Sequence, residues 1–261
     1  MDAFEKVLAA RDTNRPTGLS FLNAIVSDFV EFHGDRRFGD DPAVVGGVGR
    51  LGDLPITVIC TEKGSDTKDR VSRNFGSAHP EGYRKALRLM KQAEKFRRPV
   101  LTLVDTAGAF CGLEAEERGQ GLAIAENLME LMTLRTPVIA VVTGEGGSGG
   151  ALALAVANQV WMLENAAYSV ITPEGCASIL WKDAQRRDEA AAFLGLTAEK
   201  LLELGLIDEV ISEEDGDFDL VKEHLKFQLT TAFKILSALS DEELTRQRYE
   251  KFRTMGVNRI C

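Results

Sequence analysis

The stretch 141-VVTGEGGSGGALALA-155 decides the fold, because it joins an apolar run, a glycine-rich turn and a run of small apolar residues. Residues 144–149 match the GxGxxG pattern of dinucleotide-binding loops, and residues 146–150 match the GxSxG pattern of serine hydrolases. A third interpretation is simpler: a buried strand enters a turn whose bare backbone amides, at the start of a helix, can hold an anion. The rest of the sequence is needed to distinguish between a cofactor loop, a nucleophile and an amide cradle.

The same pattern occurs once before in the chain. Residues 99–110, PVLTLVDTAGAF, and residues 137–150, PVIAVVTGEGGSGG, each consist of a proline, a buried strand and a Gly/Ala turn. A helix is predicted after each turn, over 114–134 and up to Ala157. Nearly apolar strands that alternate with helices are typical of a parallel sheet covered on both faces. The sequence therefore predicts an α/β fold.

The N-terminal third has its own periodic segments. Residues 19–32 carry apolar side chains at helical spacing and predict one helix. Residues 43–51 and 54–64 predict a hairpin turned at residues 52–53. Residues 81–96 predict an amphipathic helix.

The segments after the glycine turn are shorter. Two strands are expected within 159–175, and two short helices and a final strand within 188–211. The acidic residues of 213–219 predict a solvated linker. One or two C-terminal helices are expected after it.

Composition excludes several classes of protein. The chain has 261 residues and a formal net charge of -9, which argues against general nucleic-acid binding. The four cysteines are Cys60, Cys111, Cys176 and Cys261, and they form no CxxC pair. A zinc ribbon or a redox dithiol is therefore not expected, and we expect the protein to work in a reducing compartment. No signal-peptide core or run of about 18 apolar residues is present, so we expect a cytoplasmic protein without a membrane span.

The two named motifs are weak here. A dinucleotide loop needs an acid about 20 residues on, a place that Glu164 could fill, but this loop falls past the middle of the chain. A nucleophilic Ser148 needs a histidine, and the hydrolase chain order leaves only His224, in what reads as an ordinary helix. The other histidines, His33 and His79, precede the serine.

The amide-cradle interpretation requires fewer specific side chains than the other two. Glycines let a bound group approach the backbone, and a helix N-terminus adds positive potential. Two such amides make an oxyanion hole, and the turn at 106–110 can supply the facing amide. One structural alternative stays open, in which the glycines only allow tight packing of helix against strand.

Several long segments resemble the α subunits of the carboxyltransferase of bacterial multi-subunit acetyl-CoA carboxylase. They are 31-EFHGDRRFGDDPA-43, 74-NFGSAHPEGYRKALRLM-90, 105-DTAGAF-110, 114-EAEERGQG-121, 144-GEGGSGGALA-153 and 168-YSVITPEGCASILW-181. The resemblance implies a crotonase fold, in which ββα units wind into a superhelix with N- and C-terminal helices. It implies a single carboxyltransferase domain over 1–261, with its core at about 19–211 and a helical extension at about 219–261.

The resemblance also implies a reaction. Carboxybiotin, held on a biotin carboxyl carrier protein, gives its carboxyl group to acetyl-CoA, and the product is malonyl-CoA for fatty acid synthesis. The implied partners are that carrier and a related β subunit that bears a zinc ribbon, in an α2β2 heterotetramer. Biotin stays on the separate carrier, and no metal is expected in this chain.

The family pattern assigns backbone roles to the glycine turn. It implies that the amides of Gly146 and Gly147 stabilise the biotin oxyanion. The residues implied to shape the same pocket and bind substrate are Gly108, Ala109, Gly149 and Gly150. Ser148 is then a small spacer.

Two nearby glutamates are assigned structural roles. Crotonase-fold hydratases use a pair of glutamates, and here Ala151 stands at the first of those positions. One carboxylate cannot serve as both acid and base in water addition as that pair does, so hydratase chemistry is disfavoured and Glu164 is expected to be a structural or strand-end residue. Glu145 is expected to bond nearby amides.

Some alternatives stay open at this stage. The chain could act on another acyl-CoA, or it could be a non-catalytic scaffold of the same fold. The basic residues between Lys63 and Arg98 could be the solvated face of a helix or a patch for phosphates. The apolar residues of 122–132 could serve an interface or the core.

Overall fold

The computed structural model describes residues 1–257, and within them the strands form one sheet. The strands pair in the order β1-β2-β3-β4-β5-β6-β8, and β7 lies beside the end of β5. Their bounds are β1 Ser27–Glu31, β2 Val44–Leu51, β3 Leu54–Thr61, β4 Val100–Thr106, β5 Val138–Gly147, β6 Gln159–Leu163, β7 Ala167–Ser169 and β8 Glu209–Ile211.

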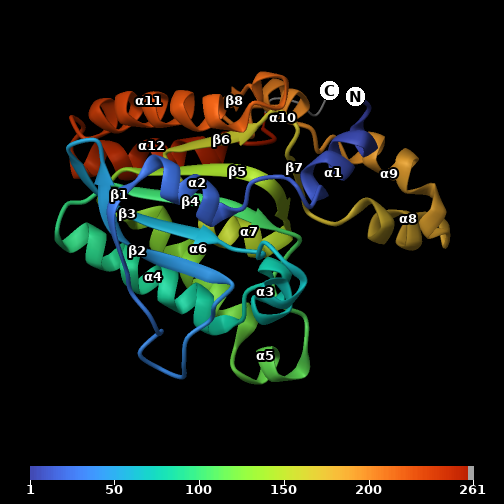
Figure 1. Cartoon of the computed structure of the whole chain (residues 1–261), viewed down its shortest axis with the longest axis horizontal. Helices are drawn as coiled ribbons and strands as arrows, with labels where there is room; N and C mark the ends of the chain where they lie inside the picture. The colour runs from blue at the N-terminus through green and yellow to red at the C-terminus, as the bar shows by residue number, and fades with distance from the viewer. Residues whose placement is uncertain (258–261) are drawn as a thin grey trace.

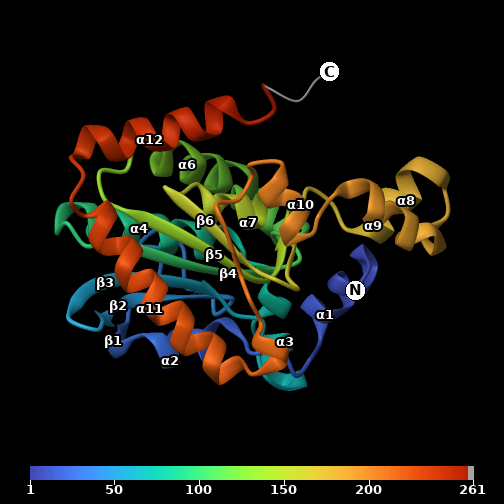
Figure 2. The same cartoon turned by 90° about the horizontal axis from the view of Figure 1, so that it is seen from above.

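Helices cover both faces of this sheet (Figures 1 and 2). The helices are α1 Ala3–Arg11, α2 Gly18–Ile25, α3 Thr67–Ser72, α4 Pro80–Lys95, α5 Leu113–Glu117, α6 Gln120–Thr133, α7 Ser148–Ala155, α8 Pro173–Trp181, α9 Arg187–Leu194, α10 Ala198–Glu203, α11 Phe218–Leu236 and α12 Asp241–Thr254. One layer contains α4, α6 and α7, and the opposite layer contains α2 and α11. Helix α12 packs outside α6.

The strand directions confirm the predicted hairpin and parallel sheet. Strands β1, β2 and β3 pair antiparallel, whereas every pair from β3 to β8 is parallel. Every residue of β4 is buried, as expected for a strand covered on both faces. Because β4 and β5 are parallel neighbours, their carboxyl ends, and the Gly/Ala turns that follow, lie at one edge of the sheet.

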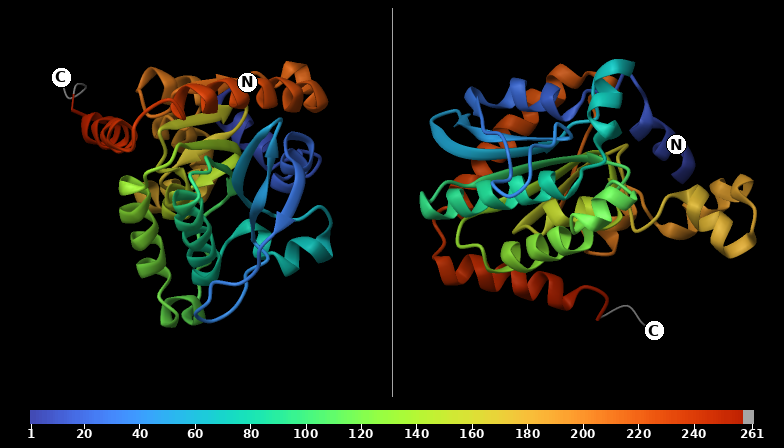
Figure 3. Two further views of the ribbon diagram at one scale, coloured as in Figure 1. Left: turned by 90° about the vertical axis from the view of Figure 1, so that its left-hand side faces the viewer. Right: turned by 90° about the horizontal axis from the view of Figure 1, so that it is seen from below.

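A helical arm extends from that end of the molecule (Figures 1 and 3). It consists of α8 and α9, with α1 packed against α9 and against β5. The chain was not expected to form α1 or α8. Both begin with recognisable signals, since Asp2 and Glu5 form a capping box and Thr172 caps α8 directly before Pro173.

The prediction of one helix over 19–32 was wrong in its second half. Helix α2 ends at Ile25, and the chain continues as edge strand β1. The cause is tertiary: Gly47 and Gly49 of β2 leave room for it, since a Cβ on Gly47 would lie 2.1 Å from the Val30 oxygen. Apolar spacing alone cannot show that a neighbouring strand accepts this segment.

The other predictions differ mainly in boundaries. The helix expected over 114–134 is broken at Gly119, whose φ of 84° separates α5 from α6. The short helices and strand expected within 188–211 are α9, α10 and β8, and the C-terminal helices are α11 and α12. The proposed domain limits, 19–211 and 219–261, stay a prediction, and Cys261 lies outside the described residues.

Candidate active site

The first turn of the site follows β4 and is held by the Thr106 side chain and by the segment that precedes α4. The Gly108 N–H donates to Thr106 Oγ1 at 3.1 Å, and the Phe110 N–H donates to the Ala78 oxygen at 2.9 Å. The Phe110 ring stacks on His79, with 4.0 Å between ring centroids. These contacts fix the loop that contains Gly108 and Ala109.

The second turn joins β5 directly to α7. Gly146 and Gly147 are the last residues of β5 and pair with Tyr168 and Ser169 of β7. Gly147 is the N-cap of α7 and has no side chain that could cap it. The first amides of a helix have no partner within the helix, so those of Gly149 and Gly150 are free to face an anion.

The two turns touch through their backbones. A Cβ on Gly147 would lie 2.0 Å from the Ala107 oxygen, and a Cβ on Gly150 would lie 2.4 Å from the Ala109 nitrogen. Contacts shorter than 3 Å do not occur for real side chains, so both positions require glycine. The sequence-predicted residues at 108, 109, 147 and 150 are therefore brought together in one place.

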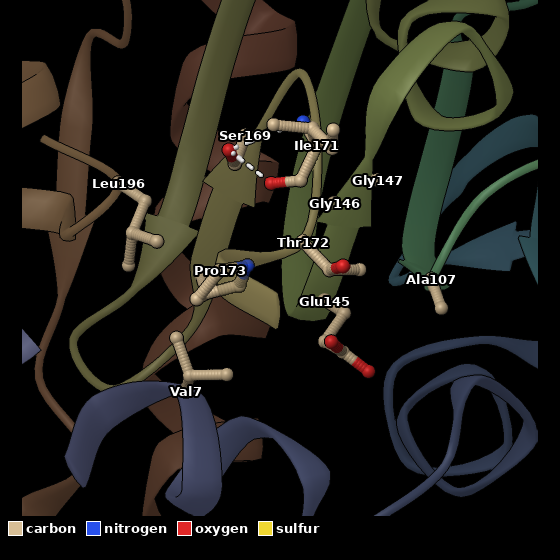
Figure 4. A pocket seen from close by; sticks show the side chains of 11 residues that line it. Val7, Ala107, Glu145, Gly146, Gly147, Ser169, Ile171, Thr172, Pro173 and Leu196 are labelled. Atoms are coloured by element: carbon tan, nitrogen blue, oxygen red, sulfur yellow. Dashed lines mark hydrogen bonds between the residues drawn. The ribbon is translucent and has the colours of Figure 1, made fainter. Parts of the chain in front are cut away.

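The remaining two predicted residues, Gly146 and Gly149, each border a hollow. Gly146 lies at a small hollow of about 20 Å³, room for one water, between β5, α1 and the start of α8 (Figure 4). Val7, Thr172 and Glu145 surround it. Gly149 borders a hollow of about 380 Å³ whose lining is apolar and includes Leu152.

Arginines from the N-terminal segment hold the base of the second turn. Arg11 at the end of α1 donates to Glu145 at 2.7 Å and to Glu174 of α8 at 2.8 Å. Burial alone would raise the pKa of Glu174, but the hydrogen bond from Arg11, a backbone hydrogen bond and the charges of Arg11 and Arg187 together lower the pKa. The expectation that the Glu145 carboxylate bonds amides was wrong, because α1 brings a guanidinium to it.

A second arginine forms a buried ion pair across the chain. Arg15 donates to the Thr143 oxygen at 2.7 Å and to Glu213 at 3.0 Å, and both charged side chains are almost fully buried. Glu213 also accepts the Asn165 N–H at 2.8 Å. The prediction of a solvated acidic linker was therefore wrong at Glu213, which anchors the segment after β8.

Each of the three histidines is hydrogen-bonded to a residue other than Ser148, so the structure does not support the nucleophile interpretation. His33 is hydrogen-bonded to Asp40, His79 to Asn74 and His224 to Glu214. His224 belongs to the exposed face of α11, as its sequence context indicated. Glu164 accepts the N–H of residue 213 at 3.2 Å, which agrees with its expected role at a strand end.

Five of the eleven lysines and arginines in the segment 63–98 have carboxylate partners. The pairs are Lys63 with Asp105, Arg73 with Asp69, Arg84 with Asp35 and Glu81, Lys85 with Asp40, and Lys91 with Glu94 and Glu130. Lys85 is fully buried. Paired and buried cations hold the fold together, so only exposed members such as Lys95 and Arg97 fit the solvated-face interpretation.

No group of three or more His, Cys, Asp or Glu side chains within residues 1–257 is arranged to hold a metal ion. No helix in the same range is long and apolar enough to cross a membrane.

Comparison with known proteins places the chain among close relatives. A family model described as acetyl co-enzyme A carboxylase carboxyltransferase-like matches residues 1–256. The acetyl-coenzyme A carboxylase carboxyl transferase subunit alpha of Ruminiclostridium cellulolyticum is 59% identical and covers 98% of this chain and 99% of its own. The protein of the same name from Clostridium acetobutylicum is 54% identical and covers 97% and 94%.

Solved structures confirm the predicted fold class. Transcarboxylase 12S matches with a TM-score of 0.72 at 19% identity, over 88% of this chain and 44% of its own. A chain of a Pseudomonas malonate decarboxylase hetero-tetramer matches with a TM-score of 0.70 at 18% identity, over 93% and 97%. At such identities the likeness concerns the fold alone, which is the crotonase fold.

Proposed function

The chain belongs to the family of acetyl-CoA carboxylase carboxyltransferase α subunits, and we propose that its paired turns hold the oxyanion that forms when carboxybiotin gives up its carboxyl group. The acceptor is acetyl-CoA and the product is malonyl-CoA. The observation that carries the proposal is the backbone contact between the turn at 107–109 and the turn at 147–150. In this contact the backbone at residues 107–109 packs directly against Gly147 and Gly150, which supports a cradle shared by the two turns.

The chemistry suits such a cradle. When the bond between the biotin nitrogen and the carboxyl carbon breaks, the electron pair stays on the ureido group and negative charge grows on its oxygen. Fixed backbone amides stabilise that charge without reorganising, and each donor is worth roughly 3–4 kcal/mol. The freed biotin nitrogen takes the methyl proton of acetyl-CoA, and the resulting carbanion attacks the released carboxyl carbon. No side-chain base is needed.

The roles of individual residues follow from their positions. Gly146 and Gly147 lie where the turn leaves β5, and Gly149 and Gly150 present the first amides of α7. The Ala109 nitrogen of the other turn lies 2.4 Å from the place of a Gly150 Cβ. Ser148 has a positive φ of 53° and acts as the bend between strand and helix.

We also propose that the chain works with a β subunit, as an α2β2 heterotetramer, and receives biotin on a separate carrier protein. Exposed apolar side chains support a partner. Leu122 and Met129 lie exposed on α6 while Ala123 and Leu131 are buried, so the segment 122–132 serves both the core and the surface.

The test is the reverse reaction. Malonyl-CoA and free biocytin are mixed with this chain alone and with its β subunit, and acetyl-CoA is followed. Activity that requires both chains supports the proposal, and the same assay with methylmalonyl-CoA examines the alternative acyl-CoA. If the two chains fold and associate but acetyl-CoA does not form, the proposal is wrong and a non-catalytic scaffold is the better description.

A further inference from the structure

Asp105 is a buried carboxylate that the proposed chemistry does not use, although it touches both turns. It is the next-to-last residue of β4 and is 2% exposed. Its Oδ1 accepts the backbone N–H of Glu145 at 2.9 Å, directly before Gly146. Its Oδ2 forms an ion pair with Lys63 at 2.6 Å. One side chain therefore joins the ends of β3, β4 and β5.

This bond lies where the backbone ladder is irregular. Val104 pairs with Val142, but the next partners are Thr106 and Gly146, so β5 contains two additional residues between them. Between these two pairs, regular backbone hydrogen bonds between β4 and β5 do not fix how far β5 extends past the end of β4. The Asp105 carboxylate supplies a hydrogen bond in the gap. Gly144 makes room for it, because a Cβ there would lie 2.3 Å from Oδ1.

Lys63 keeps the carboxylate in place. Its side chain is mostly buried, and its ammonium group also donates to the Ala10 oxygen of α1 at 3.4 Å. A buried carboxylate without a cation is strongly unfavourable, so Lys63 is what allows Asp105 to accept a bond at this depth. Buried ion pairs are seldom the most stable solution for a core, and a pair at such a place is a candidate for a specific geometric role.

We propose that Asp105, held by Lys63, is a positioning residue that sets the distance between the two turns. The inference rests on the proposed function, in which amides from both turns share one oxyanion. A misplacement of about 1 Å can lower turnover about 100-fold. The role belongs to the hydrogen bond with Glu145, and the charge of the pair serves only to make that bond possible.

Two double variants separate this role from simple stability. In Asp105→Asn with Lys63→Met, the amide oxygen can still accept the Glu145 N–H and no charge is left. In Asp105→Leu with Lys63→Met, the pair is replaced by apolar side chains and the bond is lost. Apolar replacement of a buried pair is often neutral or stabilising, so the second variant is expected to fold.

The expected results differ between the two variants. In the biocytin assay with the β subunit, the Leu/Met variant should lose about 10- to 100-fold in kcat with the KM for malonyl-CoA unchanged. The Asn/Met variant should recover most of that kcat. Gly144→Ala, which leaves both charges but displaces Oδ1, should lose kcat like the Leu/Met variant and covers the case in which that variant does not fold.

A second readout is independent of activity. The Glu145 amide proton should exchange with solvent faster in the Leu/Met variant than in the Asn/Met variant and the wild type. Equal kcat in the two double variants, or equal exchange, would overturn the positioning role. If the wild type is inactive and the exchange difference is nevertheless seen, the proposed function fails while the tie between the turns stands.

Discussion

Gly147 and Gly149 lie two residues apart in one turn, yet only one of them has to be glycine. A Cβ on Gly147 would meet the Ala107 backbone at 2.0 Å, whereas on Gly149 the nearest atom is the Ile124 Cγ2 at 3.6 Å, an ordinary contact. Gly150 resembles Gly147, with the Ala109 nitrogen at 2.4 Å. The turn thus has a packed side, which meets the other turn, and an open side, which borders the apolar hollow. A match to a glycine motif does not distinguish these positions, whereas the packing around them does.

The largest effect is expected below the packed side, at Arg15. Its guanidinium supports the Thr143 oxygen just before the turn and pairs with buried Glu213. Arg15→Met leaves that carboxylate buried without a cation, and the free energy of unfolding should fall by about 3–5 kcal/mol. Urea unfolding measures it. Adding Glu213→Leu should restore most of the loss; no restoration would mean that the ion pair is not the cause.

Breaking the packed side itself should stop the reaction. Gly147→Ala forces its Cβ against backbone atoms that cannot rotate away, so the two turns must separate. We expect kcat in the biocytin assay to fall roughly 100- to 1,000-fold, the loss seen when an oxyanion donor is removed. Association with the β subunit, followed by size-exclusion chromatography, should persist. Wild-type turnover in this variant would contradict the cradle.

Lowering the pH should weaken the Arg15–Glu213 ion pair that lies below the packed side. Burial alone would raise the pKa of Glu213, but hydrogen bonds from Arg15 and Asn165 and the Arg15 charge lower it below its ordinary 4.5. Such a carboxylate stabilises the fold above the unfolded pKa, and this stability is lost as pH falls through the folded pKa. Unfolding free energies measured from pH 6 downward should therefore decline more steeply for the wild type than for Glu213→Gln. Parallel curves would show that Glu213 does not contribute.

The open side should tolerate a side chain. Gly149→Ala meets only ordinary contacts, and alanine in a helix is favoured over glycine by up to about 1 kcal/mol. We expect a small rise in the free energy of unfolding and a loss of kcat far smaller than for Gly147→Ala. Equal losses of kcat in the two variants would remove the distinction between the sides.

The smallest effect is expected at Tyr83, which packs beneath Gly150. Its hydroxyl lies 2.8 Å from the place of a residue-150 Cβ, is buried and has no hydrogen-bond partner within residues 1–257. Burial raises the pKa of Tyr83, and the nearby Asp41 charge adds to this, so the hydroxyl stays neutral. Removing an unpaired buried hydroxyl is neutral or slightly stabilising. Tyr83→Phe should thus unfold at the same or higher urea concentration, with Tyr249→Phe on the exposed face of α12 as the control.

The sequence by itself determined the elements whose signals are local. The hairpin at residues 52–53, the two strands that end in Gly/Ala turns and the amphipathic α4 were all readable, because side-chain period and turn residues act over a few positions. Those same strand ends identified the candidate site, and the long motifs around them identified the family.

Only the tertiary structure decided which side of the turn is packed and what supports it. Arg15 and Glu213 are 198 residues apart, Arg11 and Glu145 134, and Asp105 and Glu145 40. Such pairs leave no periodic signal, since each depends on where separate elements meet after folding. The strand β1 was misjudged for the same reason, because its neighbour β2 and not its own spacing made it a strand.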